Sequence, residues 1–331
     1  MSQMLILAAD EVAELLDLDA LIDALAPAMA DLSAGRASVP NRIGAVVPDV
    51  DGRLMAMPGH VPSQGALVTK LVSLFPRNAG TERPTHQAVI VVFDPVTGTP
   101  SAVLDGTVIT AVRTGAGSAL STRLLAREDA SVLAIIGTGV QARSHARAVV
   151  HVRPIREIRI AGRDLCRSDA LAAELQKELD VEVRAVGSYR EAMDGAHVVC
   201  ATTHPGEPAV RREWLAPGTH VTSVGWSPSG REVDDATVAA ALVCVESRQA
   251  ALAPVTAAGS GDLAEPLRQG LISADRIVEI GELVTGERSG RTSADQITLY
   301  KSVGVAVQDA TAATLVLAAA RAAGIGRDLA L

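Results

Sequence analysis

Residues 131–142 read Ser-Val-Leu-Ala-Ile-Ile-Gly-Thr-Gly-Val-Gln-Ala, and they restrict the possible folds more than any other part of the chain. The apolar, largely β-branched first half stops at Gly137, and a Gly-x-Gly-x-x-Ala turn then opens a helical segment. A strand, a glycine-rich turn and a helix N-terminus in that order are typical of dinucleotide-binding folds. Gly137 permits the tight turn, Gly139 lets the backbone approach a pyrophosphate, and Ala142 lets the helix pack closely on the strand. An ordinary tight turn between strand and helix is the alternative. The residues predicted to line the cofactor in this turn are Gly137, Thr138, Gly139, Val140 and Gln141.

Downstream of this turn, strands and helices alternate, which predicts a doubly wound parallel sheet. The expected strands are 131–136, 157–161, 181–185, 197–201, 220–224 and 242–245. A long alanine-rich helix is expected over 303–323, ending at Gly324 with no strand after it. Upstream, two helices are expected before Gly35, then strands, then a helix that leads into the nucleotide domain. The upstream strands are expected at 43–47, 54–57, 66–74, 88–93 and 101–104, and the helix at 110–126.

The composition limits the class of protein. A chain of 331 residues predicts about two domains. Although 48% of the residues are hydrophobic, no apolar run reaches membrane-spanning length without polar interruption, and no secretory signal pattern is seen, so a soluble cytoplasmic protein is expected. The net charge of −8 argues against a nucleic-acid or anionic-membrane surface. The seven histidines show no metal-ligand spacing, so no metal is expected.

The end of the second expected strand reads Gly162-Arg163-Asp164. At this place NAD enzymes usually carry an acidic residue that binds the ribose 2′-hydroxyl, whereas an arginine accommodates the 2′-phosphate of NADP. Gly162 is not an acid and Arg163 follows it, so NADP(H) is favoured over NAD(H). Asp164 keeps NAD(H) as the alternative.

Three basic residues of the upstream segment are candidate anion binders: Arg42, Lys70 and Arg113. Lys70 is one of only three lysines, and it lies within the apolar expected strand 66–74. A charge in such a strand needs a partner, because burying it alone is costly. A structural ion pair would satisfy it. Alternatively, two arginines hold a substrate carboxylate with Lys70 beside it, since guanidinium groups bind carboxylates in two-point fashion.

Nearly the whole chain resembles the ornithine cyclodeaminase and mu-crystallin family. The motifs that carry the resemblance are Thr85-His86-Gln87-Ala88, Asp94-Pro95…Thr97-Gly98, Ile109-Thr110-Ala111…Arg113-Thr114, Gly137 to Ala142, Glu213-Trp214-Leu215…Pro217-Gly218, Val224-Gly225, Arg231-Glu232…Asp234-Asp235, Gly261-Asp262 and Tyr300-Lys301-Ser302…Gly304. The resemblance implies a homodimer. It also implies a Rossmann domain (116–297) inserted into an α+β substrate and dimerisation domain (1–115 plus 298–331).

The resemblance also implies roles for individual residues. Arg42, Lys70 and Arg113 match family residues that hold the substrate carboxylate and lie near its reacting nitrogen, and Lys70 is the expected catalytic residue. The residues that match the family's cofactor site are Thr85, Arg113, Gly139 to Gln141, Arg163, Thr203, Val224 and Thr298.

One loop departs from the family pattern. Ornithine cyclodeaminases carry an acidic residue after the Val-Gly pair that activates the substrate amine. Here the loop from Val224 to Arg231 has no carboxylate before Glu232, and it is a residue shorter than in mu-crystallin. A general base for the amine of ornithine is therefore missing from its expected place, unless Glu232 or Asp234 substitutes for it.

These observations together predict an NAD(P)H-dependent reductase of cyclic or acyclic imino acids, such as Δ1-pyrroline-2-carboxylate. The alternatives within enzymes are ornithine cyclodeaminase and an alanine-dehydrogenase-like enzyme. The alternative from another class is a non-catalytic, crystallin-like binding protein. Residues near Met55, Met57, His60 and Trp226 are expected to shape the wall of the pocket opposite the substrate carboxylate.

Overall fold

The computed structural model describes residues 3–225 and 230–330, and it divides into two compact units. The first unit comprises Met1–Arg113 and Val305–Leu331, and the second comprises Thr114–Gly304, so the second is inserted into the first along the chain. Residues 298–304 were expected in the first domain. The structure assigns them to the second unit, because Thr298–Lys301 forms strand β14, which pairs with strands of that unit.

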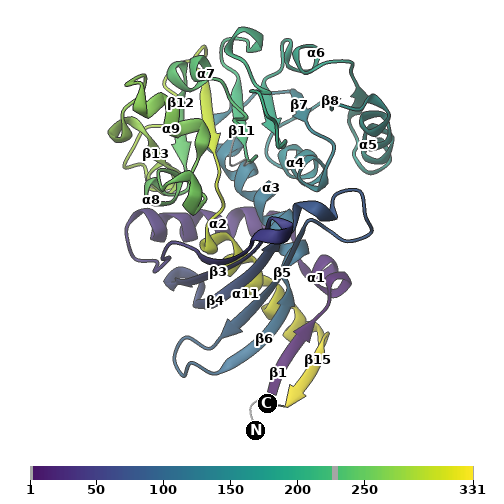
Figure 1. The fold of residues 1–331 in the computed structure, drawn as a ribbon, viewed down its shortest axis with the longest axis vertical. Coiled ribbons are helices and arrows are strands. Elements are labelled where there is room, and N and C mark those ends of the chain that lie inside the picture. Colours follow the sequence, from purple (N-terminus) through teal and green to yellow (C-terminus); the bar gives the residue numbers. More distant parts are fainter. Residues whose placement is uncertain (1–2, 226–229, 331) are drawn as a thin grey trace. The chain divides into compact units, whose positions relative to one another are not determined.

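The second unit is built on a parallel sheet, in which the described residues form eight strands (Figure 1). The strands are β7 (Val132–Ile136), β8 (Glu157–Ala161), β9 (Glu182–Ala185), β10 (Val198–Ala201), β11 (His220–Ser223), β12 (Leu242–Val245), β13 (Val278–Glu279) and β14 (Thr298–Lys301). They lie in the order β13-β12-β14-β11-β10-β7-β8-β9. The chain runs outward from β7 in one direction through β8 and β9, and in the other through β10 and β11. In such sheets ligands bind at the carboxyl ends of the strands where the order reverses, here between β7 and β10.

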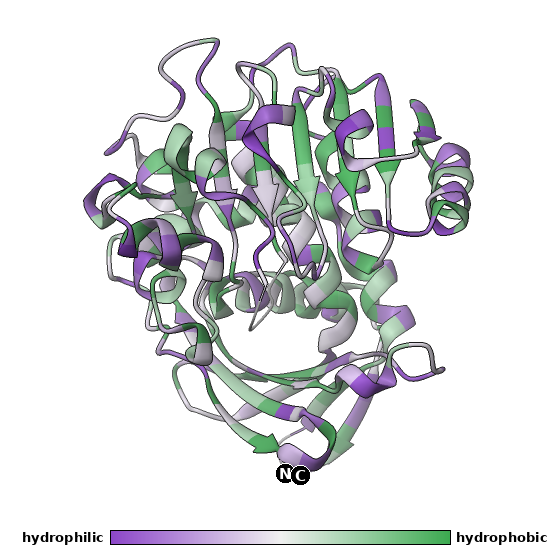
Figure 2. Ribbon diagram, turned by 45° about the horizontal axis from the view of Figure 1, so that its top comes forward, coloured by the Kyte–Doolittle hydropathy of each residue, from purple (hydrophilic) through white to green (hydrophobic). Residues whose placement is uncertain are grey.

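Both faces of this sheet are covered by helices, which explains why its central strand β7 is apolar on both sides. Along β7, Leu133 and Ile135 belong to one buried cluster, and Ala134 and Ile136 belong to a second. Figure 2 shows hydrophobic stretches along the central strands of the parallel sheet, whereas its outer strands also carry hydrophilic residues. The helices are α4 (Val140–Val150), α5 (Leu165–Glu178), α6 (Tyr189–Met193), α7 (Asp235–Ala240), α8 (Arg248–Ala251), α9 (Gly261–Arg268) and α10 (Ile280–Thr285).

The first unit contains a mixed sheet, to which the described residues contribute seven strands in the order β15-β1-β6-β5-β4-β3-β2. They are β1 (Gln3–Leu7), β2 (Ile43–Val47), β3 (Gly52–Val61), β4 (Ala66–Leu74), β5 (His86–Phe93), β6 (Pro100–Asp105) and β15 (Arg327–Ala330). The expectation that no strand follows the last helix is wrong, since β15 pairs antiparallel with β1. The helices of this unit are α1 (Ala9–Leu15), α2 (Leu18–Ser33) and α11 (Ala306–Ala323), and α3 (Gly106–Leu125) begins in it and ends in the second unit.

The two faces of the mixed sheet differ in what covers them. Helix α11 packs on β3 and β4 and against α2, and it buries one face. On the other face, Ile43, Ala56, Leu71 and Val89 form a row across four neighbouring strands. Ile43 is 72% exposed, and Leu71 and Val89 are also exposed in the single chain. The first unit therefore presents an apolar sheet face to solvent. Within residues 3–225 and 230–330, the helices are too short or too polar to span a bilayer.

Candidate active site

The side chain of Lys70 lies in the interior of the first unit. Lys70 is in the middle of β4, opposite Met57 of β3 and Ile90 of β5, and only 2% of it is exposed. Its Nζ donates to Oδ1 of Asp309 on α11 at 2.8 Å and to Oγ1 of Thr110 at 3.5 Å. The strand thus carries a buried ammonium group that a carboxylate of the covering helix balances.

A second cation shares this carboxylate. Arg113 on α3 donates from Nε to the same Oδ1 of Asp309 at 3.1 Å, and from Nη1 to Oε1 of Gln308 at 2.6 Å. Arg42 is half-buried and close enough to Lys70 to act on it electrostatically. The three residues predicted to bind the substrate are therefore brought together within the first unit. Lys70 and Arg113 share the carboxylate of Asp309, and Arg42 lies within electrostatic reach of Lys70, so three basic side chains gather in one region of the first unit.

Burial lowers the pKa of Lys70 to about 8. Desolvation is the largest cause, because it penalises the charged form, and the charges of Arg113 and Arg42 act in the same direction. The charge and hydrogen bond of Asp309 act in the opposite direction. A lysine with a pKa near 8 can hold or release a proton close to physiological pH, which suits acid–base chemistry.

Asp309 and Gln308 were not predicted from the sequence. Both side chains are buried, yet Oδ2 of Asp309 and Nε2 of Gln308 have no hydrogen-bond partner among the described residues. Buried polar atoms are usually paired, so an unpaired acceptor and an unpaired donor beside Lys70 indicate a place for a polar ligand or water. The available signal was an aspartate in an otherwise alanine-rich helix.

The predicted pocket wall is only partly described. Met57 lies on the same sheet face as Lys70 and packs with Val72, Ala88 and Ala306, with Met55 at the edge of this cluster. His60 pairs with Leu67 towards the far end of the β3–β4 ladder. Trp226 lies outside the described residues, as do residues 227–229 of the shortened loop.

In the second unit, the glycine-rich turn joins β7 to α4 as the sequence predicts. Gly137 has a φ of +122°, and a Cβ there would lie 2.6 Å from Oγ1 of Thr202, so the turn requires glycine. A Cβ on Gly139 would meet nothing within 4 Å, which leaves open space at the start of α4. Gly139, which has no side chain, is the N-cap of α4. The N–H groups of its first turn are therefore suited to bind phosphate.

The other residues of this turn also fit a dinucleotide. Val140 is exposed at the first position of α4, and the side-chain Oε1 of Gln141 is buried without a partner in the described part of the chain. Arg143, which was not predicted, donates to the carbonyl oxygens of Thr138 and Gly139 at 3.3 and 3.4 Å. These bonds hold the carbonyl groups of the turn, whereas the N–H of Gly137 donates to the carbonyl oxygen of Ala161 at 2.8 Å.

Residues 162–164 at the end of β8 have separate tasks. A Cβ on Gly162 would lie 2.7 Å from Cγ2 of Thr138, so glycine allows the close approach of the two turns. Arg163 is exposed. Asp164 is the N-cap of α5 and accepts a hydrogen bond from the N–H of Cys166 at 3.0 Å. The acidic candidate for a ribose ligand is therefore already used as a helix cap.

Thr203 and Val224 follow the carboxyl ends of β10 and β11, the edge at which the phosphate-binding turn also lies. Thr298 does not lie at this edge. It is the first residue of β14, opposite His220, and its Oγ1 lies 2.8 Å from Nδ1 of His220. Its assignment to the cofactor site is not supported, because dinucleotides bind at the carboxyl ends of parallel strands. Thr85, in the first unit, lies before β5, where its carbonyl accepts from the N–H of Phe75.

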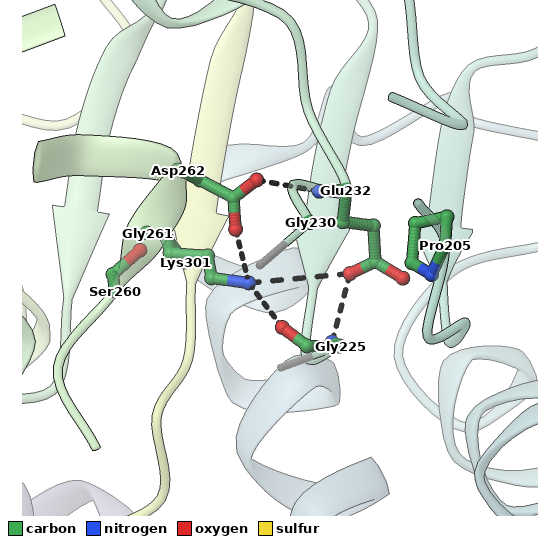
Figure 3. Close-up of a pocket in the computed structure, with 8 residues that line it drawn as sticks. All are labelled: Pro205, Gly225, Gly230, Glu232, Ser260, Gly261, Asp262 and Lys301. Atoms are coloured by element: carbon green, nitrogen blue, oxygen red, sulfur yellow. Dashed lines mark hydrogen bonds and ion pairs between the residues drawn. The ribbon is translucent and has the colours of Figure 1, made fainter. Parts of the chain in front are cut away.

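Glu232 is buried in a network at the carboxyl edge of the second sheet (Figure 3). Its Oε1 accepts from the N–H and the hydroxyl of Thr203, and its Oε2 accepts from Ser223 Oγ and the N–H of Gly225. Lys301 lies 4.0 Å from Oε2 and forms a 2.8 Å ion pair with Asp262. With four hydrogen bonds accepted, Glu232 has no oxygen left for a substrate amine.

The carboxylate of Asp234 likewise accepts hydrogen bonds from backbone N–H groups. It accepts from the N–H of Thr237 at 2.9 Å as the N-cap of α7, and from the N–H of Arg212 at 3.2 Å. The two acids considered as replacements for the missing base of the loop therefore have structural roles.

The chain is similar to known proteins over nearly its full length. The model of the ornithine cyclodeaminase/mu-crystallin family matches residues 2–324. The ketimine reductase mu-crystallin of Mus musculus is 38% identical over 300 residues, 89% of this chain and 90% of that protein. A structure of Thermococcus litoralis Δ1-pyrroline-2-carboxylate reductase with NADH and L-proline is 36% identical, covers 98% of this chain and 100% of its own, and has a TM-score of 0.93. An archaeal alanine dehydrogenase dimer with bound NAD is 28% identical, covers 99% of both chains and has a TM-score of 0.90.

The mixed α/β fold, the glycine-rich turn and the buried Lys70 cluster occur in a chain that the family model matches almost from end to end. The resemblance inferred from the sequence motifs is thereby confirmed. The chain belongs to the ornithine cyclodeaminase/mu-crystallin family.

Proposed function

We propose that this chain is an NAD(P)H-dependent reductase that reduces a C=N bond next to a carboxylate, giving an amino or cyclic imino acid. The observation that carries the proposal is the buried cluster of Lys70 and Arg113 on the carboxylate of Asp309, with Arg42 close enough to Lys70 to act on it electrostatically. Guanidinium and ammonium groups gathered in this way fit the carboxylate of an imino acid. The names of the mouse relative and of the Thermococcus structure, a ketimine reductase and a Δ1-pyrroline-2-carboxylate reductase, support the same reaction.

In this proposal, different residues bind the substrate, donate the proton and bind the cofactor. Arg42 and Arg113 bind the carboxylate, which orients the imine carbon. Lys70, with its pKa of about 8, donates the proton that the imine nitrogen needs as the C=N bond becomes a C–N bond. Oδ2 of Asp309 accepts from the N–H of the protonated imine, which gives that buried oxygen a partner. The first turn of α4 binds the pyrophosphate of the dinucleotide, which supplies the hydride when bound.

The assay that tests the proposal follows NAD(P)H oxidation with Δ1-pyrroline-2-carboxylate as substrate. We expect turnover with this imine, and no ammonia from ornithine with NAD⁺. Proline and ammonia from ornithine would show instead that the chain is a cyclodeaminase. The engagement of Glu232 and Asp234 in structural hydrogen bonds speaks against that reaction.

Two further controls cover the remaining alternatives. The archaeal neighbour is an alanine dehydrogenase, so pyruvate with ammonia belongs in the same assay. Faster NAD(P)H oxidation with pyruvate and ammonia than with the cyclic imine would assign the chain to that activity. Tight dinucleotide binding without turnover on any imine would identify a non-catalytic binding protein.

We propose NADP(H) as the preferred cofactor, because Arg163 is exposed after β8 while Asp164 is used as the cap of α5. Arg163→Gln is expected to lower the preference for NADPH over NADH roughly tenfold or more, the value of a lost hydrogen bond to a charged group. The ratio of kcat/KM for the two cofactors measures this. Arg156→Gln, at an exposed arginine that precedes β8 at the opposite end of the strand, is the matched control and is expected to leave the ratio unchanged. An unchanged ratio in the Arg163 variant would remove the assignment.

We propose that the chain forms a homodimer through the exposed apolar sheet face of the first unit, the row of Ile43, Ala56, Leu71 and Val89. Exposed apolar patches of this kind mark interaction sites, and the archaeal neighbour is a dimer. Light scattering on the purified chain distinguishes the dimer from a monomer. Because the reaction draws on the cellular nicotinamide pool, we propose the cytoplasm as its location.

A further inference from the structure

The buried ion network around Lys301 serves no part of the reaction described above. Lys301, Glu232 and Asp262 are each at most 4% exposed and lie together in the second unit (Figure 3). Lys301 donates to Ser223 Oγ at 2.9 Å and to the carbonyl of Gly225 at 2.7 Å, besides its ion pair with Asp262. A buried ion network of this kind is often no more stabilising than an apolar cluster of the same volume. Its contribution therefore lies in the parts of the backbone that it holds in place.

The network fixes two loops at the carboxyl edge of the parallel sheet. Glu232 binds Thr203, which follows β10, and Gly225, which follows β11. Gly225 lies so close that a Cβ there would be 2.1 Å from the carbonyl oxygen of Thr203 and 2.5 Å from Oε1 of Glu232. Asp262 in turn accepts from the N–H groups of Glu232 and Val233 at 2.6 and 2.9 Å, which fixes the backbone that carries Glu232.

The network also sets the hydrogen-bonding direction of Thr203. Its N–H and its hydroxyl proton both point to Oε1 of Glu232, at 2.6 and 2.8 Å. A threonine hydroxyl has one proton and two lone pairs. With the proton held by Glu232, the hydroxyl oxygen of Thr203 presents only an acceptor to any ligand at this edge.

We propose that Glu232 is a positioning residue that makes Thr203 an acceptor for the carboxamide N–H of the nicotinamide ring. The proposal rests on the proposed function, because it needs a nicotinamide dinucleotide at this edge. The carboxamide carries two N–H donors, so a fixed acceptor fixes the rotation of the ring. The adenosine end of the same cofactor is assigned to the α4 turn and Arg163, with which the network makes no hydrogen bond in the described residues.

The experiment distinguishes the contribution of the nicotinamide end of the cofactor to binding from that of the adenosine end. Dissociation constants of NADPH and of 2′,5′-ADP, a fragment without nicotinamide, are measured by calorimetry on the full chain and on Glu232→Gln. A glutamine offers one acceptor oxygen where the carboxylate offers two, so it cannot satisfy the four donors, and the Thr203 hydroxyl is freed to rotate. We expect a roughly three- to tenfold loss of NADPH affinity, the value of one hydrogen bond between neutral groups, and an unchanged affinity for 2′,5′-ADP.

Two further variants keep the test sharp if Glu232→Gln folds poorly. Thr203→Val is expected to lose NADPH affinity to a similar extent and to spare 2′,5′-ADP, and Thr203→Ser is expected to recover most of that loss. Glu282→Gln is the matched control, because it removes another buried carboxylate of the second unit, one paired with Arg248 at 2.6 Å. It is expected to lower the melting temperature without changing the ratio of the two affinities.

The outcomes are distinct. Equal losses of NADPH and 2′,5′-ADP in Glu232→Gln would show that the network is only structural and would overturn the proposal, as would no loss of either. A wild-type chain that binds neither NADPH nor NADH would refute the proposed function itself, and this inference with it. Binding of NADH alone would refute only the NADP(H) preference, and NADH and ADP would then replace NADPH and 2′,5′-ADP in the same test. A selective loss of NADPH supports the positioning role.

Discussion

Lys70→Met is expected to lower kcat for imine reduction by roughly 10²- to 10⁴-fold, the usual contribution of a general acid. Methionine keeps the unbranched apolar body of the lysine side chain but carries no proton. The variant leaves the carboxylate of Asp309 paired with Arg113 at 3.1 Å, so the site keeps one of these two ion pairs. Steady-state kinetics with Δ1-pyrroline-2-carboxylate measure the effect, and Lys177→Met, at an exposed lysine of α5, is the matched control.

The pH profile distinguishes a proton donor from a residue that only balances charge. In the proposed role, the working form of Lys70 is the ammonium, which predominates below its pKa of about 8 and is lost above it. In the wild type, kcat/KM is therefore expected to fall as the pH rises through about 8. Lys70→Arg keeps the positive charge but does not titrate in this range, so the fall of kcat/KM above a pH of about 8, the alkaline limb of the profile, is expected to disappear. A limb that persists unchanged in Lys70→Arg would show that another group supplies the proton.

Asp309→Asn is expected to have the second largest effect. It removes the carboxylate that pairs directly with both Lys70 and Arg113. Loss of one partner from a buried ion pair commonly costs about 3 to 5 kcal/mol, so the free energy of unfolding is expected to fall by about that amount. Because the charge of Asp309 raises the pKa of Lys70, its loss lowers that pKa further, and the alkaline limb of kcat/KM moves to lower pH.

Asp31→Asn supplies the control for this variant. Asp31 is a buried aspartate of the first unit that accepts from Arg36 and from the N–H of Ser63. We expect its replacement to destabilise the chain while the alkaline limb stays in place. If Asp309→Asn behaved in the same way, its role would be confined to stability, and the acceptor role of its Oδ2 would have to be withdrawn.

The fold was largely predictable from the sequence where the signals are local. Strands β7 and β8 and helix α4 follow from an apolar run, a glycine turn and a second apolar run within residues 131–161. Strands β1, β13, β14 and β15 were not predicted. They are short, and β14 ends in Lys301, whose charge is balanced by Asp262, a residue distant in the sequence. A charge at the end of a short apolar run obscures a strand until its partner is known.

The candidate site shows the same limit. Lys70 was identifiable because a lysine within an apolar strand is conspicuous, whereas its partner Asp309 lies 239 positions away in the sequence. The sequence could not exclude Glu232 as a base. The groups that donate hydrogen bonds to its carboxylate, at Thr203 and at Ser223 to Gly225, reach it only in the folded chain. Thr298 was assigned to the cofactor site from the family resemblance. Without β14, nothing in the sequence shows that this residue begins a strand and lies at the amino edge of the sheet.

The helix cap at Asp164 limits how the cofactor preference of this chain can be redesigned. If Arg163 selects NADP(H) as proposed, a protein engineer who seeks an NADH-dependent variant would turn first to Asp164, the acid next to it. Its carboxylate binds the N–H of Cys166, and releasing a cap of this kind costs about 1 kcal/mol. A new acid at position 162 would meet Thr138, since a Cβ there lies 2.7 Å from Cγ2. Position 163 is therefore the substitution site that leaves both the helix and the turn intact.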